Sequence, residues 1–349
     1  MFADLRAVRA TVPSGVRQVS QPLRIFAGGL GRSGTTLITE LLGRHHQIAG
    51  LAWETRFIVD ADGLGELVWA LSRDWAGPST AGMKVQAFRQ MMMHDLLEPE
   101  QHPYLSYDML AHFERDHYWS TIGAFLRRVI RAEWCATGLS ANRSFRVDAP
   151  VGHRHLTVTV TDAAPTRILP NVFAFEEIRA LAAQLVDALF GDYARRLGRS
   201  SWVEKTPHNI LSPFPRLLFP DCYVLHIVRD PRDVAVSIAD GHSWGPESIR
   251  DAIDWVAAFY ERWLVLRPDY LEDERYIEMR YEALVAEPCA ELQKLCARLG
   301  LEFDPAMLAN LPHASAVGRY ATGMSDDDRA YLESNVAELA ARAGLAEFQ

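Results

Sequence analysis

The spacing of apolar and polar residues predicts short strands and longer amphipathic helices. Short apolar runs are typical of buried strands, and they occupy residues 23–27, 221–229 and 276–282. Apolar residues that recur every three or four positions indicate helices, at 173–197, 248–266, 288–299 and 326–343. Asp230 followed by Pro231 predicts a capped helix start, and Gly300 predicts a helix end.

Residues 60–200 have a less regular pattern. Helices are expected at 64–71 and 125–134, and the alternation at 155–161 predicts a half-buried strand. Residues 1–22 are polar with scattered valines and are expected to form a leader outside the core. The chain has 349 residues, enough for one large α/β domain or two smaller ones.

A glycine-rich segment, residues 28–36, stands between the first predicted strand and a helix predicted over 37–42. In such an arrangement the free backbone N–H groups and the positive end of the helix dipole point at an anion. The segment carries one basic residue and three hydroxyl groups, on Arg32, Ser33, Thr35 and Thr36. A glycine turn without a ligand is therefore a poor interpretation, and a phosphate site is expected.

A Walker A motif fits this segment only in part. Gly29 and Gly34 have the required spacing, and Thr36 stands at the Ser/Thr position. Thr35, however, replaces the lysine that would reach the β- and γ-phosphates. This replacement counts against an ATPase or a kinase.

Two further interpretations of the same segment compete. Gly29, Gly31 and Gly34 fit the dinucleotide pattern G-x-G-x-x-G, and Glu54 lies 20 residues beyond Gly34, where a ribose-binding acid would stand. Alternatively, residues 31–37 resemble the opening motif of sulfotransferases, in which a basic residue precedes Ser-Gly-Thr-Thr. The segment alone leaves both open.

Two charged residues are expected at strand ends, where open parallel sheets bind their ligands. Glu54 follows a short strand predicted to end near Trp53, and Lys205 ends a strand that Pro207 stops. These positions favour a role in the same crevice as the glycine-rich segment. For Glu54 the alternative is a surface ion pair with Arg56, which would contribute little.

A second phosphate site is predicted where the strand at 221–229 meets the next helix. Arg229 precedes that helix, and Ser237 lies eight positions further on, about two helical turns inside it. Both side chains can address one phosphate, the arginine through its planar guanidinium. The alternative is that Arg229 pairs with a nearby acid while Ser237 faces a neighbour on its helix.

Composition excludes several functional classes. The net charge is −9, so nucleic acid is not an expected partner and any basic site must be local. The four cysteines form no C-x-x-C pair and are typical of thiols in a reducing compartment. No apolar stretch approaches about 18 residues and no signal-peptide core is visible, so no membrane span and a cytoplasmic location are expected.

Taken together, the motifs resemble the sulfotransferase family in the correct order along the chain. Residues 31–37 resemble its 5′-phosphosulfate loop, residues 229–237 its 3′-phosphate motif, and residues 280–285 its segment near the adenine. The stretches 53–56 and 204–207 are most similar to the tyrosylprotein sulfotransferase branch and its bacterial relatives.

The resemblance implies an α/β fold with a central parallel sheet flanked by helices, related to the P-loop kinases. It implies the donor 3′-phosphoadenosine 5′-phosphosulfate (PAPS), which leaves as adenosine 3′,5′-bisphosphate after in-line transfer of the sulfuryl group, without a metal. The implied donor-binding residues are Arg32, Ser33, Gly34, Thr35, Thr36, Arg229, Ser237 and Tyr281. The implied catalytic residues are Glu54 as general base, kept ionised by Arg32 and Arg56, with Lys205 and Arg32 stabilising developing charge.

One departure from the tyrosylprotein branch concerns the acceptor. The 150 residues between Glu54 and Lys205 exceed what that branch uses. Residues 23–349 are therefore expected to form one domain with a largely helical acceptor-binding insert at about 60–200, and the acceptor is expected to be a small molecule. Two other hypotheses remain, an NAD(P)-dependent oxidoreductase that uses the glycines and Glu54, and a regulatory nucleotide-binding module.

Overall fold

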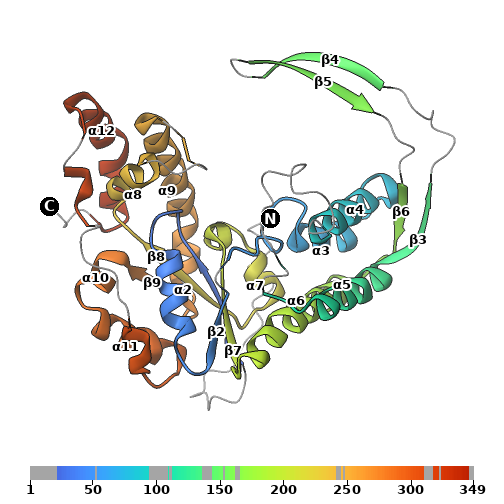
Figure 1. Ribbon diagram of the computed structural model, residues 1–349, viewed down its shortest axis with the longest axis horizontal. Coiled ribbons are helices and arrows are strands. Elements are labelled where there is room, and N and C mark those ends of the chain that lie inside the picture. Colours follow the sequence, from blue (N-terminus) through green and yellow to red (C-terminus); the bar gives the residue numbers. More distant parts are fainter. Residues whose placement is uncertain are drawn as a thin grey trace. The chain divides into compact units, whose positions relative to one another are not determined.

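The structure is a computed structural model (Figure 1). It describes residues 22–51, 53–93, 109, 112–135, 144–151, 154–161, 166–240, 245–246, 248–309, 317–321 and 324–345. The expected leader lies, up to residue 21, outside these residues. The chain divides into two compact units, one of residues 1–60, 107–114 and 186–349, the other of residues 61–106 and 115–185.

Five parallel strands form the central sheet of the first unit, in the order β2, β7, β1, β8, β9 (Figure 1). Their bounds are β1 (Arg24–Gly28), β2 (Ile48–Gly50), β7 (Ser201–Lys205), β8 (Tyr223–Val228) and β9 (Tyr276–Arg280). The predicted central parallel sheet is confirmed. Because β1 is the middle strand, the glycine-rich segment that follows it lies at the centre of the sheet's carboxyl edge.

Apolar side chains on both faces of this sheet explain why helices cover each of them. Successive strand residues point to opposite faces. On one face, Ile25 and Ala27 belong to a buried cluster with α2 (Thr35–Gly43), α10 (Tyr281–Ala286) and α11 (Pro288–Leu299). Phe26, between these two residues in β1, points to the other face. There the Trp202 ring lies edge-on to the rings of Phe26 and Phe190, with centroids 5.3 Å and 4.9 Å away.

The structure describes several further helices in this unit. They are the carboxyl-terminal part of α6 (Phe175–Arg196), η5 (Pro207–Ile210), α7 (Phe214–Leu218), α8 (Pro231–Ala239), α9 (Ile249–Leu271), η6 (Pro305–Leu308), η8 (Arg319–Ala321) and α12 (Asp326–Arg342). The predicted cap of α8 is confirmed, because the Asp230 carboxylate accepts from the Arg232 backbone N–H at 2.9 Å. Gly300 ends α11 with a φ of 71°, as predicted.

The second unit falls within the stretch expected to be the insert. It contains α3 (Leu64–Ser72), η1 (Gly77–Ser79), α4 (Ala81–Met92), α5 (Arg115–Val129) and the start of α6. Two antiparallel pairs complete it, β3 (Ile130–Cys135) with β6 (Thr166–Pro170), and β4 (Ser144–Val151) with β5 (Arg154–Thr161). The strand predicted at 155–161 is therefore present, and the acceptor-binding role of this stretch stays a prediction.

Three predicted element bounds were wrong. The helix expected at 125–134 ends at Val129, because the following residues pair with β6 as a strand. The strand expected to end near Trp53 ends at Gly50, and the strand expected over 276–282 ends at Arg280. The last two errors matter for the site, because Glu54 and Tyr281 lie beyond the ends of their strands and not within them.

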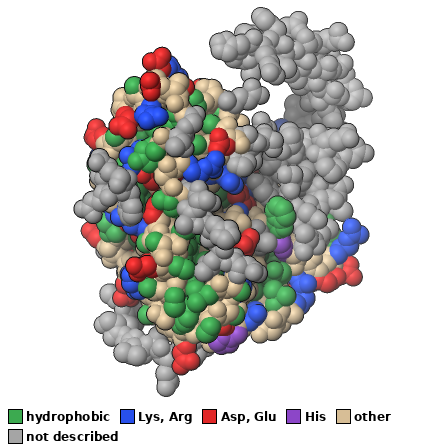
Figure 2. Space-filling model, turned by 60° about the vertical axis from the view of Figure 1, so that its left-hand side comes forward, with side chains coloured by type: hydrophobic (Ala, Val, Ile, Leu, Met, Phe, Trp, Pro, Cys, Tyr) green, Lys and Arg blue, Asp and Glu red, His purple; other side chains and the backbone are tan. Residues whose placement is uncertain are grey.

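The described surface carries charges of both signs. Acidic and basic side chains are interspersed over the face shown in Figure 2. Among the helices that the structure describes, none combines the length and the apolar composition needed to cross a bilayer.

Candidate functional site

The glycine-rich segment turns sharply between β1 and α2. Gly29 and Gly34 have φ angles of 148° and 102°, which only glycine adopts readily. A Cβ on Gly34 would lie 2.5 Å from Cδ2 of Tyr281, so this position also requires glycine for space. Arg32 adopts a φ of 71°, a strained conformation for a non-glycine residue that is common at functional sites. The segment thus presents the first turn of α2 to a ligand.

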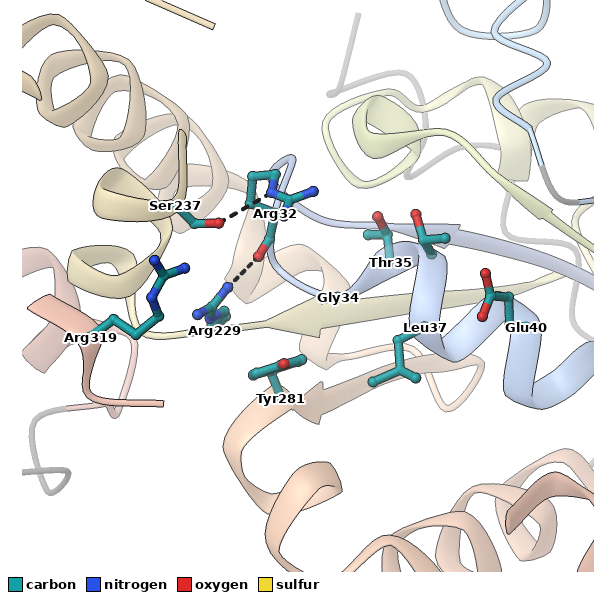
Figure 3. Close-up of a pocket in the computed structure, with 10 residues that line it drawn as sticks. Arg32, Gly34, Thr35, Leu37, Glu40, Arg229, Ser237, Tyr281 and Arg319 are labelled. Atoms are coloured by element: carbon teal, nitrogen blue, oxygen red, sulfur yellow. Dashed lines mark hydrogen bonds between the residues drawn. The ribbon is translucent and has the colours of Figure 1, made fainter. Parts of the chain in front are cut away.

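A pocket of about 380 Å³ opens beside this segment (Figure 3). Its lining residues are Arg32, Gly34, Thr35, Thr36, Leu37, Glu40, Arg229, Ser237, Tyr281 and Arg319. The structure therefore brings seven of the eight predicted donor-binding residues to one pocket. The eighth, Ser33, is 1% exposed in the adjoining turn, and its Oγ has no hydrogen-bond partner among the described residues.

The two predicted phosphate segments are joined directly. The guanidinium of Arg229 donates to the backbone oxygen of Arg32 at 2.7 Å, and Nε of Arg32 donates to Oγ of Ser237 at 3.2 Å (Figure 3). The Arg229 guanidinium also lies 4.8 Å from the centroid of the Tyr281 ring, a cation–π arrangement. Arg32, Arg229 and Ser237, which are distant in sequence, thus lie together on one side of the pocket, next to the ring of Tyr281.

Arg319 is a pocket residue that the sequence did not assign. It begins η8, and the buried carboxylate of Asp233 on α8 accepts from the backbone N–H groups of its neighbours Gly318 and Tyr320, at 2.8 Å and 3.1 Å. The signal in the sequence was weak: Arg319 is the one lysine or arginine between residues 312 and 328. Its place in the pocket is set by a contact between segments about 85 residues apart.

The pocket concentrates positive charge from Arg32, Arg229 and Arg319. Burial lowers the pKa of the Arg32 guanidinium, and the positive charges of Arg229 and Arg319 lower it further. Part of this charge is balanced, because Asp233 lies 3.9 Å from Arg229, Asp240 pairs with Arg319 and Glu40 also lines the pocket. The guanidinium groups nevertheless offer paired N–H donors of the kind that bind phosphate oxygens.

Glu54, Lys205 and Thr36 meet at the carboxyl end of the glycine-rich segment. The Lys205 ammonium lies 3.3 Å from a carboxylate oxygen of Glu54 and donates to Oγ1 of Thr36 at 3.2 Å. Arg56 lies 3.8 Å from the other oxygen of Glu54. Two cations therefore lie beside the Glu54 carboxylate. The ion pair with Arg56 that was considered as the alternative is present, and Lys205 contacts the same carboxylate in addition.

Arg32 was expected both to bind the donor and to keep Glu54 ionised. Its guanidinium instead contacts Ser237, and Lys205 stands beside Glu54 together with Arg56. This difference arises because the side chain of Arg32 extends toward α8, as Figure 3 shows. A catalytic role for Arg32 stays a prediction.

One cluster of possible metal ligands lies elsewhere in the first unit. The side chains of His45, His46 and Asp304 bring their ligand atoms within 4.8 Å of one another. Nδ1 of His45 accepts from the backbone N–H of Gln47 at 3.1 Å, and Nε2 lies 3.0 Å from the backbone oxygen of Glu302. Both ring nitrogens are thus engaged, and the cluster ties the end of α2 to η6.

The sequence matches a model of the sulfotransferase family over residues 22–305. No curated protein that was compared with the chain matches it. The family match covers both predicted phosphate segments, Glu54 and Lys205. It does not address the tyrosylprotein branch, which stays a prediction.

Distantly similar solved structures carry the same family name. The sulfotransferase domain of a Synechococcus olefin synthase is 15% identical, with a TM-score of 0.41 over 93% of this chain and 98% of that one. A sulfotransferase from Alicyclobacillus acidocaldarius is 15% identical, with a TM-score of 0.43 over 95% and 98% of the two chains. The family assignment rests on the sequence match and not on these structures.

Proposed function

The chain belongs to the sulfotransferase family, and from that premise we propose that it transfers the sulfuryl group of PAPS to a hydroxyl or amine of a small molecule. The observation that carries the proposal is a single pocket shared by the glycine-rich segment and the Arg229–Ser237 segment. A donor with phosphate groups at two positions of its ribose needs two such segments at a fixed separation.

The pocket offers complementary contacts to each part of the donor. Backbone N–H groups at the start of α2, with the hydroxyls of Thr35 and Thr36, suit the 5′-phosphosulfate. Arg229, Ser237 and Arg319 suit the 3′-phosphate, because guanidinium groups bind phosphate oxygens in pairs. Tyr281, beside Arg229, is proposed as the contact on the adenine side.

The reaction requires one proton acceptor and several groups that stabilise charge. As the acceptor oxygen attacks sulfur, a new S–O bond forms while the bond from sulfur to the bridging phosphate oxygen breaks. The acceptor proton passes to Glu54, and the electron pair of the broken bond leaves with adenosine 3′,5′-bisphosphate. Lys205, in contact with Thr36 of the glycine-rich segment, stabilises charge on the leaving oxygen, and Arg32 is proposed to assist.

An oxidoreductase remains the contrasting hypothesis on motif grounds, but two observations favour sulfuryl transfer. The family match spans most of the chain, and the Lys205 ammonium, 3.3 Å from Glu54, is suited to stabilise charge on a leaving oxygen. A dehydrogenase would also have no use for the segment of Arg229 and Ser237.

Binding and turnover experiments separate these functions. In a thermal-shift assay, adenosine 3′,5′-bisphosphate should raise the melting temperature and NAD should not, because binding to the native state stabilises it. Incubation with ³⁵S-labelled PAPS and a panel of phenols, alcohols and amines should then yield a labelled product. Stabilisation by NAD alone would contradict the proposal, and binding without any labelled product would favour a regulatory module.

A further inference from the structure

Glu204 on β7 carries a buried carboxyl group that no step of the proposed reaction uses. The residue is 1% exposed, yet its carboxylate accepts four hydrogen bonds. The donors are Oγ1 and the backbone N–H of Thr55, at 2.9 Å and 3.4 Å, Oγ1 of Thr206, at 2.5 Å, and Nδ2 of Asn209, at 2.8 Å. A buried polar group destabilises the fold unless it has hydrogen-bond partners. The four hydrogen bonds supply these partners, and they also hold the three donor residues in fixed positions around the carboxylate.

Two of these contacts fix the segments on which the proposed catalytic residues stand. Thr55, which donates twice to Glu204, directly follows Glu54. Lys205 directly follows Glu204, and its side chain points to the opposite face of the strand. The carboxylate therefore ties the backbone beside Glu54 to the backbone beside Lys205.

The remaining contacts extend this tie to the central strand. Nδ2 of Asn209 also donates to the backbone oxygen of Ala27, one residue before the end of β1. Oγ1 of Thr206 also accepts from the backbone N–H of Arg56 at 3.2 Å. The ends of β1 and β7 and the segment after β2 are thus held by one buried network.

A carboxylate is an unusual choice for this position. Burial raises the pKa of the Glu204 carboxyl, and the hydrogen bonds from Thr206, Asn209 and Thr55 oppose that shift. An apolar residue would satisfy the packing of a fully buried strand. A carboxylate, in contrast, accepts hydrogen bonds from several donors at once and so fixes the positions of the residues that carry them.

We propose that Glu204 is a positioning residue that sets the place of Glu54 relative to Lys205 and the glycine-rich segment, without touching donor or acceptor. This inference rests on the proposed function for its kinetic consequence. Its structural consequence, the pairing of Glu54 with Lys205, is independent of the reaction.

The substitution Glu204→Gln tests this role, because it keeps the volume but replaces an accepting oxygen by an NH₂ group that opposes the donors. The phenol or alcohol that the panel shows to be turned over fastest serves as acceptor. We expect kcat to fall about 10- to 100-fold, the effect of a small misplacement of reacting groups. The Kd of adenosine 3′,5′-bisphosphate should change less than about twofold, since the pocket contacts are untouched.

The split between turnover and donor affinity distinguishes positioning from a general loss of stability. A misplaced Glu54 lowers kcat while the Kd of adenosine 3′,5′-bisphosphate stays near the wild-type value. A variant that is merely less stable keeps the wild-type kcat at temperatures where it is folded.

Glu278→Gln is the matched control. Glu278 is a β9 residue that accepts from Nε of Arg267 at 2.9 Å and from the hydroxyl of Tyr276 at 3.1 Å, away from the pocket. The control variant should lower the melting temperature and leave kcat unchanged. If Glu204→Gln fails to fold, Thr55→Val removes one donor to Glu204 and should give a smaller effect in the same direction.

A reaction-independent readout is the rate at which an amine-reactive reagent labels Lys205, measured by mass spectrometry. Glu204→Gln should raise this rate several-fold and Glu278→Gln should not. Unchanged labelling or an unchanged kcat in folded Glu204→Gln would overturn the positioning role. If the wild type transfers no sulfuryl group from PAPS, the proposed function fails, and the labelling result still decides the role of Glu204.

Discussion

The ammonium of Lys205, at the end of β7, lies 3.3 Å from the carboxylate of Glu54, in the segment that follows the neighbouring strand β2. The same ammonium donates to Thr36 in the first turn of α2. Lys205 therefore links the proposed base to the segment that is proposed to bind the phosphosulfate. A proton acceptor and a charge-stabilising group at this separation can act on the two ends of one transfer reaction.

Substitution of Glu54 tests its role as general base. Glu54→Gln should lower kcat by about 10²- to 10⁴-fold, because the variant cannot accept the acceptor proton. The Kd of adenosine 3′,5′-bisphosphate should stay within about twofold of the wild-type value. Single-turnover kinetics with labelled PAPS and titration calorimetry measure the two quantities. A preserved rate with a collapsed donor affinity would instead favour a ribose-binding role.

Arg229→Ala should remove a charge-assisted contact to the 3′-phosphate. We expect a loss of about 1.5–3 kcal/mol, or roughly 10- to 150-fold in affinity for adenosine 3′,5′-bisphosphate. Adenosine 5′-monophosphate, which lacks the 3′-phosphate, is the internal control and should lose much less. Equal losses for both nucleotides in calorimetric titrations would show that Arg229 does not bind the 3′-phosphate.

Asp233→Asn should weaken donor binding although Asp233 is buried at the base of the loop that carries Arg319. Its two oxygens each accept a backbone N–H from that loop, and an amide can accept with only one oxygen. Arg319→Ala should reduce affinity for adenosine 3′,5′-bisphosphate about 10-fold or more. Asp233→Asn should reduce it by a smaller factor, because the variant also removes the negative charge 3.9 Å from Arg229 and thereby offsets part of the loss. In a double-mutant cycle the two effects should be less than additive. Full additivity would mean that Asp233 acts independently of Arg319.

The stability of the chain should fall in mild acid because of His226. Burial lowers the pKa of this imidazole from 6.5 to about 3, so the folded state holds it neutral. In the unfolded state the imidazole has its ordinary pKa of 6.5, so below that pH the unfolded chain binds a proton that the folded chain does not. The folding stability associated with the neutral imidazole is therefore complete above pH 6.5 and is lost progressively as the pH falls toward 3. At pH 5 the loss amounts to about 2 kcal/mol.

Urea unfolding of the wild type and of His226→Asn at pH 7 and pH 5 measures this term. The variant should show a smaller drop in unfolding free energy between the two pH values. Glu204 and Glu282 have raised pKa values because of burial, so they act in the opposite direction in both proteins and cancel in the comparison. An equal drop in both proteins would assign the acid sensitivity to other groups.

Local sequence determined the elements whose causes lie within a few residues. The glycine-rich segment could be recognised from its own residues as a turn between a strand and a helix, and Asp230 caps α8 through a residue two positions away. Gly300 likewise ends α11 by its own backbone freedom. For the same reason the spacing of Arg229 and Ser237 on one helix start could be recognised without the structure.

Only the tertiary structure decided which of these residues meet. The segment after Val129 is a strand because β6, more than 30 residues later, supplies its hydrogen bonds against the helical pattern. Arg319 reaches the pocket through Asp233, and Glu204 holds Thr55 from 149 positions away. Such contacts depend on strand order and on the directions of buried side chains, and neither is written in the spacing of apolar residues along a single segment.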